Sequence, residues 1–374
     1  MVVRPVWRVP SPLVGEGQGE GGAKIPTSTC MHRAFRGISA VFHAEAGVSM
    51  SKGESREDRA LLLAFRMLGR LPLELVTGMA RGLAWLSCWF PLSVASAYRT
   101  VLVNILLCYP ELTYREGARR ARRALMGLAA SFGEFAHVWT RPAEESLARI
   151  TSVEGLDRLR ASREAGRPIL LLTLHQSSWE LPNLLLGPEL PMTVFYQTQG
   201  SKALTEMVTR ARESTGSTLV PADSRGIRAG LAAMGRGEAV AILADHAPHG
   251  DNNPQVPFFG LPARTSNLPW KLIRKYNPDV FFVGCHREQG HRDVQVYIEP
   301  ADPEVSSDDE ARALTALNRG LAERISRWPD QYHWAIKRFR YGPRGKRRLY
   351  TSAVIPALRR ARRENRALSI EELP

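Results

Sequence analysis

The chain has very little cysteine, with four residues among 374. They stand far apart and form no Cys-x-x-Cys pair, so the sequence predicts neither a zinc site nor a disulfide framework. A protein that works in a reducing compartment fits this pattern. The four are Cys30, Cys88, Cys108 and Cys285.

Motifs that mark several common protein classes are also missing. There is no G-x-S-x-G nucleophile elbow and no P-loop. A formal G-x-G-x-x-G at Gly17, Gly19 and Gly22 has no strand before it and no helical pattern after it, which excludes dinucleotide binding there. No continuous apolar core precedes a small-residue cleavage site, so a signal peptide is not predicted.

Acidic residues are scarce relative to basic ones. Lys and Arg total 51 against 37 Asp and Glu, a net charge of +14. Twelve of the basic residues lie between Lys337 and Arg366, where Glu364 is the only acid. The excess predicts an acidic partner: an anionic membrane surface, an acidic carrier protein or nucleic acid. A basic cluster near a membrane is typical of anionic-lipid or phosphate contacts, and nucleic-acid binding is the alternative.

The first 49 residues differ from the rest. They include a low-complexity run rich in glycine and show no apolar period. From Met50 the composition becomes ordinary. Our interpretation is that residues 1–49 are a disordered tail or a wrongly assigned extension, and that Met50 is the true start.

The most apolar long stretch covers residues 58–91. Its part from Leu71 to Phe90 has about the length of a membrane span, but Glu74 and Arg81 interrupt it. Aromatic residues gather at one end, as interfacial anchors do. We expect an N-terminal membrane-anchoring helical segment at 50–97, spanning the bilayer or lying in its plane. The alternative is an amphipathic core helix.

The remainder reads as an α/β protein. Helices are predicted through Arg99 to Arg123 and over roughly 124–140. Beyond them, strands alternate with helices, which predicts a mixed, mostly parallel central sheet flanked by helices. The predicted strands are 168–174, 192–196, 239–244, 279–285 and 293–299. The predicted helices are 178–187, 201–215, 224–235, 265–276 and 308–327.

One strand ends at a histidine. The run Ile169-Leu-Leu-Leu-Thr-Leu-His175 predicts a strand buried on both faces, and Ser177 or Ser178 can cap the helix that follows. His175 would then lie at the edge where open α/β sheets bind ligands. Glu180 is five residues on and can reach the ring across the turn, which makes His175 a candidate general base oriented by Glu180. A buried histidine beside an unrelated surface Glu is the alternative.

A polar loop follows the predicted strand at 239–244. It holds Asp245, His246, His249 and Asp251, all residue types that can bind metals. Their spacing matches no specific site, so no metal is predicted.

Five segments in order resemble the bacterial lipid A late acyltransferases, the lauroyl and myristoyl acyltransferases of the lysophospholipid acyltransferase superfamily. Asn104 to Glu111 looks like the family's N-L-x-x-C-F-P-E, and Asp245 lies in its A-D-(H/Q) loop. His175 and Glu180 stand where the family has His-x4-Asp/Glu. The other two segments resemble the family's V-P-F-F-G-x-P-A-x-T block and its P-E-Q-Y-x-W-x-x-R-R-F-K ending. They are residues 256–265 and 329–340.

This resemblance implies a glycerolipid-acyltransferase-like acyltransferase domain at 98–345, followed by a basic C-terminal tail at 346–374. It implies transfer of a fatty acyl chain, lauroyl-like, from an acyl carrier protein thioester to a hydroxyl of a lipid A precursor. The expected partners are acyl carrier protein, the lipid A precursor and the cytoplasmic face of the bacterial inner membrane, with no nucleic acid. No cofactor beyond the thioester is implied.

The resemblance also implies site residues. His175 and Glu180 are the catalytic candidates. The family's Tyr-Arg-Pro after the second strand is Tyr196-Gln197-Thr198 here, so a phosphate-binding arginine is missing at that point. Arg210, Arg212 or Arg225 are candidates to replace it. The full set of predicted substrate-binding residues is Asp245, Arg264, Lys337, Arg338, Arg340, Arg210 and Arg225.

Two alternatives remain open at the level of sequence. One is another O-acyltransferase of the superfamily, acting on a lysophospholipid or an amino lipid. The block at Phe258 lacks the Glu of the glycerolipid enzymes' P-E-G-T pattern, which argues against that branch. The other is a non-catalytic, basic membrane-surface binding protein, which explains the charge but not a buried strand ending in His175.

The interpretation of the N-terminus predicts that residues 1–49 are dispensable. A chain that begins at Met50 should be expressed and should transfer acyl groups as well as the full chain, because the omitted segment has no core-forming pattern. Side-by-side expression and turnover measurements check this. Loss of expression or of activity in the shorter chain would contradict it.

Overall fold

The computed structural model describes residues 56–90, 92, 95–196, 201–248, 253–288, 293–342, 345–346 and 348–373. The predictions about residues 1–49 and about Met50 fall outside this part of the chain.

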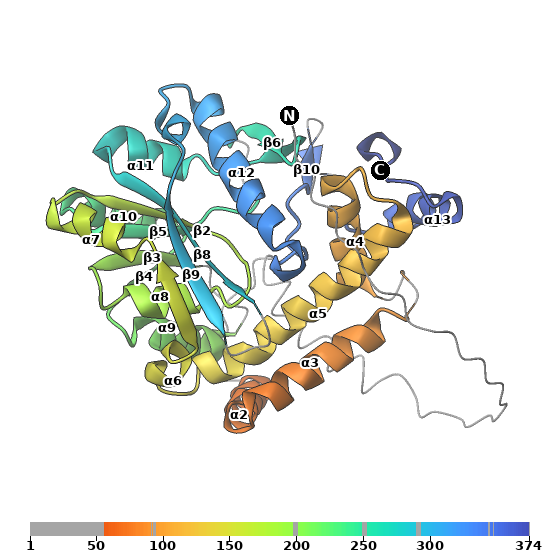
Figure 1. Ribbon diagram of the computed structural model, residues 1–374, viewed down its shortest axis with the longest axis horizontal. Helices are drawn as coiled ribbons and strands as arrows, with labels where there is room; N and C mark the ends of the chain where they lie inside the picture. The colour runs from red at the N-terminus through yellow and green to blue at the C-terminus, as the bar shows by residue number, and fades with distance from the viewer. Residues whose placement is uncertain are drawn as a thin grey trace.

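A seven-stranded mixed sheet forms the centre of the molecule (Figure 1), in the order β1-β9-β8-β2-β5-β3-β4. Five neighbouring strands, β8 to β4 in this order, run parallel, while β9 and β1 run the opposite way. The predicted mixed, mostly parallel sheet is therefore confirmed. The strands are β1 Ile150–Glu154, β2 Ile169–Thr173, β3 Met192–Tyr196, β4 Thr218–Pro221, β5 Ala239–Leu243, β8 Asp279–Arg287 and β9 Val294–Pro300.

The central strand β2 is buried on both faces, as its apolar run predicts. Leu170 and Leu172 enter one hydrophobic core, and Ile169 and Leu171 enter another on the opposite face. In the parallel register, Thr173 lies opposite Leu243 of β5. Both strands therefore end at the same edge of the sheet.

Helices cover both faces of the sheet. Residues of α10, α11 and α12 pack into the core on one face, and residues of α7 and α8 into the core on the other. All five helices predicted in the α/β part are present. They are α8 Leu181–Leu186, α9 Lys202–Glu213, α10 Ser224–Gly235, α11 Leu268–Tyr276 and α12 Glu310–Arg327; the helices that flank β1 are α6 Ala143–Leu147 and α7 Leu156–Glu164.

Some elements were not predicted or have different bounds. The short strands β1 and β4 were missed, as was the hairpin of β6 Gln255–Phe258 and β7 Leu261–Arg264. The predicted helices at 99–123 and 124–140 are instead α4 Ser96–Cys108 and α5 Tyr114–Val138. The break has a local cause, because Pro110 follows α4 and Thr113 forms a capping box with Glu116 at the start of α5.

Two helices, α2 Arg56–Arg70 and α3 Leu73–Ser87, precede this domain and contact α5, and α3 runs along it (Figure 1). Pro72 separates them, so the apolar stretch is divided in two. Within the described ranges, no helix is both long enough and apolar enough to cross a bilayer. One face of α3, with Val76, Thr77 and Ala84, is buried, as the amphipathic alternative predicts.

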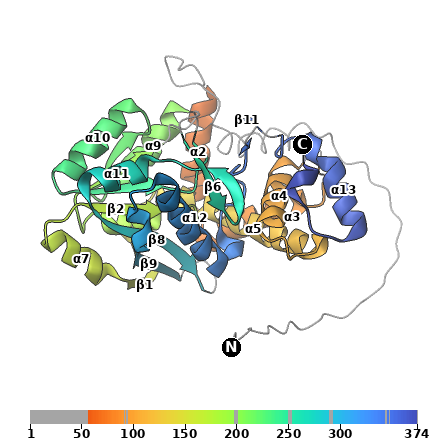
Figure 2. The same ribbon diagram turned by 90° about the horizontal axis from the view of Figure 1, so that it is seen from above.

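The segment predicted as a basic C-terminal tail contains a helix that packs on the domain. It contains helix α13 Ile355–Glu364, which lies beside α5 and α4 (Figure 2). Leu358 and Ala361 enter the main hydrophobic core, while Arg359 and Arg360 are exposed. The amphipathic spacing therefore folds this part of the tail onto the domain and directs its charges outward.

Candidate active site

His175 lies two residues beyond the end of β2, and Asp245 lies two residues beyond the end of β5. The register of the two strands therefore places them side by side. The Asp245 carboxylate accepts two hydrogen bonds from His175, one from the backbone N–H at 2.9 Å and one from ring Nδ1 at 2.8 Å. The Asp245 side chain is fully buried, and the His175 side chain is 11% exposed.

The carboxylate is held in its charged form. Burial by itself would raise the pKa of the Asp245 carboxyl, but the attraction of His175 and its hydrogen bonds outweigh burial and lower the pKa well below its usual value. A carboxylate on Nδ1 orients the ring and leaves Nε2 as the basic nitrogen. The pair therefore has the arrangement of a general base with its orienting acid.

The predicted contact between Glu180 and the His175 ring is wrong. Helix α8 begins at Leu181, with Glu180 at its N-cap position, so neither Ser177 nor Ser178 caps it as expected. From there the Glu180 carboxylate meets the Arg212 guanidinium of α9, with N···O distances of 2.5 and 2.7 Å. Glu180 is 3% exposed, so this is a buried ion pair. The acid that orients His175 is Asp245, which the sequence assigned to substrate binding.

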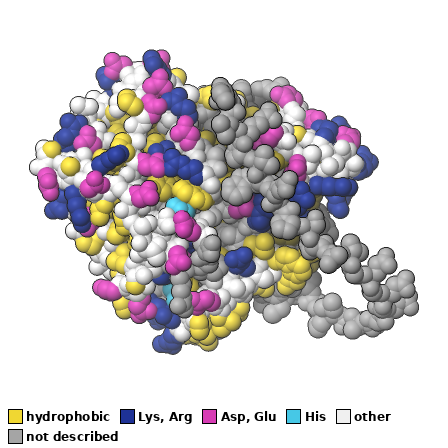
Figure 3. Space-filling model, in the orientation of Figure 1, with side chains coloured by type: hydrophobic (Ala, Val, Ile, Leu, Met, Phe, Trp, Pro, Cys, Tyr) yellow, Lys and Arg dark blue, Asp and Glu magenta, His cyan; other side chains and the backbone are white. Residues whose placement is uncertain are grey.

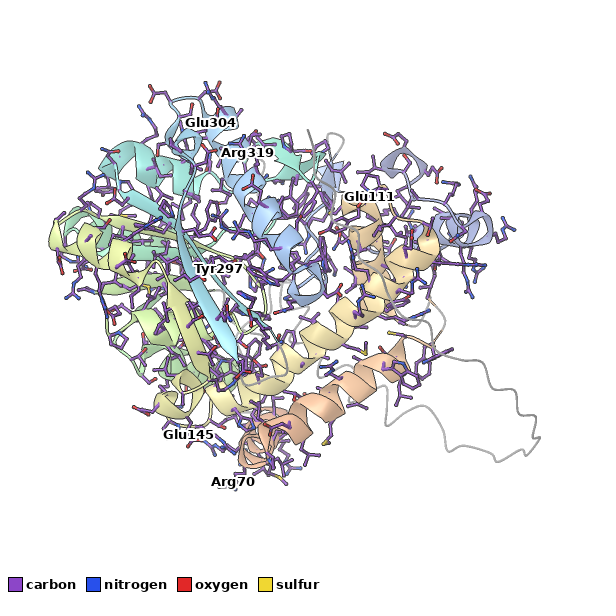
Figure 4. All side chains as sticks on the ribbon, in the orientation of Figure 1. Arg70, Glu111, Glu145, Tyr297, Glu304 and Arg319 are labelled. Atoms are coloured by element: carbon purple, nitrogen blue, oxygen red, sulfur yellow. The ribbon has the colours of Figure 1, made fainter. Side chains whose placement is uncertain are left out.

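The turn after His175 is fixed by hydrogen bonds that reach distant parts of the chain. Ser177 has a φ of 55°, in the left-handed region that non-glycine residues rarely adopt. Its N–H donates to the Gln331 carbonyl at 2.8 Å, and the His333 N–H donates to the His175 carbonyl at 2.9 Å. Gln176 accepts a hydrogen bond of 3.2 Å from the hydroxyl of Tyr297 of β9; Figure 4 labels Tyr297 on this strand. The turn is therefore held from β9 and from the segment after α12.

A buried charge cluster supports the same turn. The Ser178 hydroxyl donates to Glu134 of α5, which is 1% exposed. Glu134 also pairs with Arg287 at 2.7 Å and with Arg149 at 3.3 Å. Ser178 is thus a structural residue rather than the predicted cap. Sequence reasoning missed this cluster, although an acid inside an apolar helix and an arginine ending an apolar strand were visible signals.

Three aromatic rings surround His175. The ring centroids of His246, Trp179 and His333 lie 4.6, 5.3 and 5.8 Å from that of His175. Burial, followed by the neighbouring His175, lowers the pKa of His246 to about 4, and the same causes hold the pKa of His333 well below its usual value. Both rings are therefore uncharged near neutral pH.

No metal was predicted in the loop after β5, and no group of metal ligands occurs in the described part of the chain. His249 and Asp251 of that loop lie outside the described residues.

Two of the arginines predicted to bind substrate, Arg264 and Arg338, make contacts within the protein. Arg338 is 2% exposed, and its guanidinium donates to the Arg264 carbonyl, the Thr265 hydroxyl and the Asn318 amide oxygen. Arg264 lies 4.0 Å from the ring of Tyr341 and is also buried. In this conformation both are enclosed by protein rather than open to a phosphate group.

The other predicted binding residues are spread over the molecule. Arg340 is buried and Lys337 is half-buried. Arg210 is exposed on α9, and Arg225 is exposed in the first turn of α10. Among the described site residues that were predicted, the structure joins the side chains of His175 and Asp245, and it joins Arg338 to the backbone carbonyl of Arg264.

These features define a class of site. A histidine whose ring is held by a buried carboxylate can take the proton of a hydroxyl group that attacks an activated carbonyl. Its position at the carboxyl edge of an α/β sheet is where such folds bind substrates.

Comparison with known proteins gives the family. The model described as "Bacterial lipid A biosynthesis acyltransferase" matches residues 58–341. The chain is 26% identical over 249 residues, 66% of its length, to 80% of the lipid A biosynthesis palmitoleoyltransferase of Escherichia coli K12. It is 24% identical over 277 residues, 74% of its length, to 89% of that organism's lipid A biosynthesis lauroyltransferase. The protein therefore belongs to the bacterial lipid A biosynthesis acyltransferase family and is an acyltransferase.

The geometry predicts how substitutions in the pair will act. His175→Ala and Asp245→Asn should each lower turnover by ~10²–10⁴, because the first removes the base and the second leaves its ring wrongly oriented. The double variant should be little worse than His175→Ala, since residues that act as one unit are not additive. Steady-state turnover of folded, purified variants checks both expectations.

Glu180→Gln is the control. It leaves the buried Arg212 charge uncompensated, so the free energy of unfolding should fall by ~3 kcal/mol. Turnover per folded molecule should fall less than in Asp245→Asn. A Glu180→Gln variant as stable as the wild type and as inactive as His175→Ala would return the catalytic role to Glu180. Normal turnover by Asp245→Asn would contradict the assigned pair.

Proposed function

We propose that the protein transfers a fatty acyl chain, lauroyl-like in length, from acyl carrier protein to a hydroxyl of a lipid A precursor. The observation that carries this proposal is the His175–Asp245 pair at the sheet edge. The relatives are named for lipid A biosynthesis and for palmitoleoyl and lauroyl transfer, which supports this class of donor chain and acceptor.

The proposed reaction needs no covalent acyl-enzyme. Nε2 of His175 takes the proton of the acceptor hydroxyl as its oxygen attacks the thioester carbonyl, and Asp245 stabilises the imidazolium. The tetrahedral intermediate then collapses, the carbon–sulfur bond breaks, and the imidazolium returns its proton to the leaving thiolate. The Glu180–Arg212 ion pair, which shares the wall of a small cavity with Trp179, supports the helix that follows the base.

Acyl carrier protein is the proposed donor, and no cofactor is needed because the thioester is already activated. The net charge of +14 favours association with an acidic protein. We place the reaction at the cytoplasmic face of the bacterial inner membrane, where carrier and lipid acceptor meet.

A transfer assay tests the proposal. Full-length protein in detergent should move a radiolabelled lauroyl group from acyl carrier protein to a lipid A precursor, and His175→Ala should not. Transfer to a lysophospholipid in preference to the lipid A precursor would contradict the proposed acceptor. Label trapped on the protein itself would contradict direct transfer.

We further propose that the enzyme lies on the membrane surface through α2 and α3. Large apolar side chains are exposed along both helices, and Figure 3 shows hydrophobic atoms gathered over this region. Such a face, with tryptophans at one end, suits the interfacial region of a bilayer. This apolar face consists of Leu63, Met67, Leu75, Met79, Leu83, Trp85 and Leu86 of the two helices, with Trp89 and Phe90 directly after α3.

The membrane proposal predicts two components of attachment. High salt should release the part due to basic residues, because surface charges are screened, while the apolar part should persist. Trp85→Ser/Trp89→Ser should lower the salt-resistant fraction in vesicle sedimentation. Ile227→Ser, which removes an exposed apolar side chain on α10, is the matched control and should have no effect. Full solubility of the wild type without detergent would contradict attachment.

A further inference from the structure

A groove of about 640 Å³ lies between α2, the end of α5 and α9. A close approach of α2 to the end of α5 shapes it, because a Cβ at Gly69 would clash with the Thr140 side chain and the Ala136 carbonyl. The Arg141 guanidinium donates to the carbonyl oxygens of Gly69 and Leu71, which ties the end of α2 to the end of α5. Figure 2 shows α2 standing beside α9, and Figure 4 labels Arg70 at the end of α2. The packing of α2 on the end of α5 therefore determines the shape of the groove.

The charge of the groove is positive. Arg66, Arg70, Arg141 and Arg210 line it, and no Asp or Glu is among its described lining residues. Arg66 and Arg70 are exposed and pair with no carboxylate in the described part of the chain. Arg210 donates one long hydrogen bond, of 3.4 Å, from Nε to the Glu206 carbonyl, and its Nη2 lies 3.9 Å from the Glu206 carboxylate. Three guanidinium groups are therefore available to an anion.

The rest of the groove is apolar. Leu62, Trp139 and Met207 contribute to its walls. Arginine beside hydrocarbon suits a ligand that has a phosphate group and an apolar part, because guanidinium groups bind phosphate oxygens through two parallel hydrogen bonds. The apolar face of α2 and α3 adjoins the groove through α2, so a lipid in the membrane surface can reach it.

A series of packed aromatic rings links a wall of the groove to the catalytic residue. Trp139 stacks on Phe135 with a ring distance of 4.6 Å, Phe135 contacts Trp179 at 4.9 Å, and Trp179 contacts His175 at 5.3 Å. Three consecutive ring contacts therefore separate a groove wall from the base.

We propose that this groove binds a phosphate group of the lipid acceptor, with Arg66, Arg70 and Arg210 around the phosphate and the acceptor's hydrocarbon on Leu62, Trp139 and Met207. This inference rests on the proposed function, and it supplies the phosphate contacts that the buried Arg264 and Arg338 do not offer. A concave, partly apolar site fits a lipid headgroup better than the convex surface of an acidic protein.

Binding by full-length protein in neutral detergent tests the site without any transfer reaction. The probes are dioctanoyl phosphatidic acid, dioctanoylglycerol and inorganic phosphate, measured by calorimetry. Wild type should bind the phosphatidic acid, and the other two much more weakly, since each has half of the recognised chemistry. Arg66→Gln/Arg70→Gln should weaken binding at least ~10-fold through the lost charged hydrogen bonds. Ala211→Trp should also weaken it, by filling the groove without changing charge.

The matched control is Arg158→Gln/Arg228→Gln, which removes two exposed arginines from α7 and α10 and should change affinity less than about twofold. Equal affinity of wild type and Arg66→Gln/Arg70→Gln would overturn the site. An equal loss of affinity in the control variant would show that binding is due to general charge attraction and not to this groove. Tight binding of inorganic phosphate would mean that the ligand of the groove is a free anion and not a lipid. If Arg66→Gln/Arg70→Gln lost acyl carrier protein binding but kept lipid binding, the surface would instead be a protein docking site.

Kinetics then separate this inference from the proposed function. With a phosphorylated acceptor, Arg66→Gln/Arg70→Gln should raise KM, while kcat falls little because the base is untouched. With the dephosphorylated acceptor, the variant and the wild type should have the same KM. Phosphatidic acid binding without any acyl transfer would retain the site and reject the reaction. Acyl transfer by the wild type with the same KM for the phosphorylated and the dephosphorylated acceptor would support the reaction and reject the phosphate site.

Discussion

The parallel register between β2 and β5 is the constraint on which the active site depends. Thr173 lies opposite Leu243, so the residues two positions further along both strands emerge together. A shift by one residue would turn every side chain of β2 to the opposite face and separate the imidazole from its acid. Leu170 and Ile169 enter cores on opposite faces, which opposes such a shift. The apolar packing of one strand thereby positions a proton-transfer pair.

Buried ion pairs stabilise the two segments that follow β2 and lie outside the sheet, the turn after His175 and the start of α8. Glu134 joins Arg149 and Arg287 under the turn after His175, and Glu180 joins Arg212 at the start of α8. Removing one partner of a buried ion pair is strongly destabilising because the other charge is left uncompensated. Such pairs therefore favour one conformation of the turn. They explain how a left-handed Ser177 is maintained next to the base.

Local pattern was sufficient for most of the sheet. The strands β2, β3, β5, β8 and β9 are buried apolar runs, and their positions follow from composition alone. The strands β1 and β4 were missed because they are only partly buried and so lack a continuous apolar run. The partner of His175 was assigned wrongly for a different reason. A spacing of five residues suggested Glu180, whereas the contact crosses seventy residues of chain to Asp245.

The sequence by itself determined the family, the α/β class and the histidine at the end of a buried strand, because motif order and apolar periodicity are properties of neighbouring residues. Tertiary structure alone decided which acid holds that histidine and which arginines stay open to solvent. The sequence alone does not distinguish the environments of Arg338 and Arg66. Arg338 is enclosed by a backbone carbonyl and side-chain acceptors, whereas Arg66 lines a groove, because burial depends on the packing of distant elements.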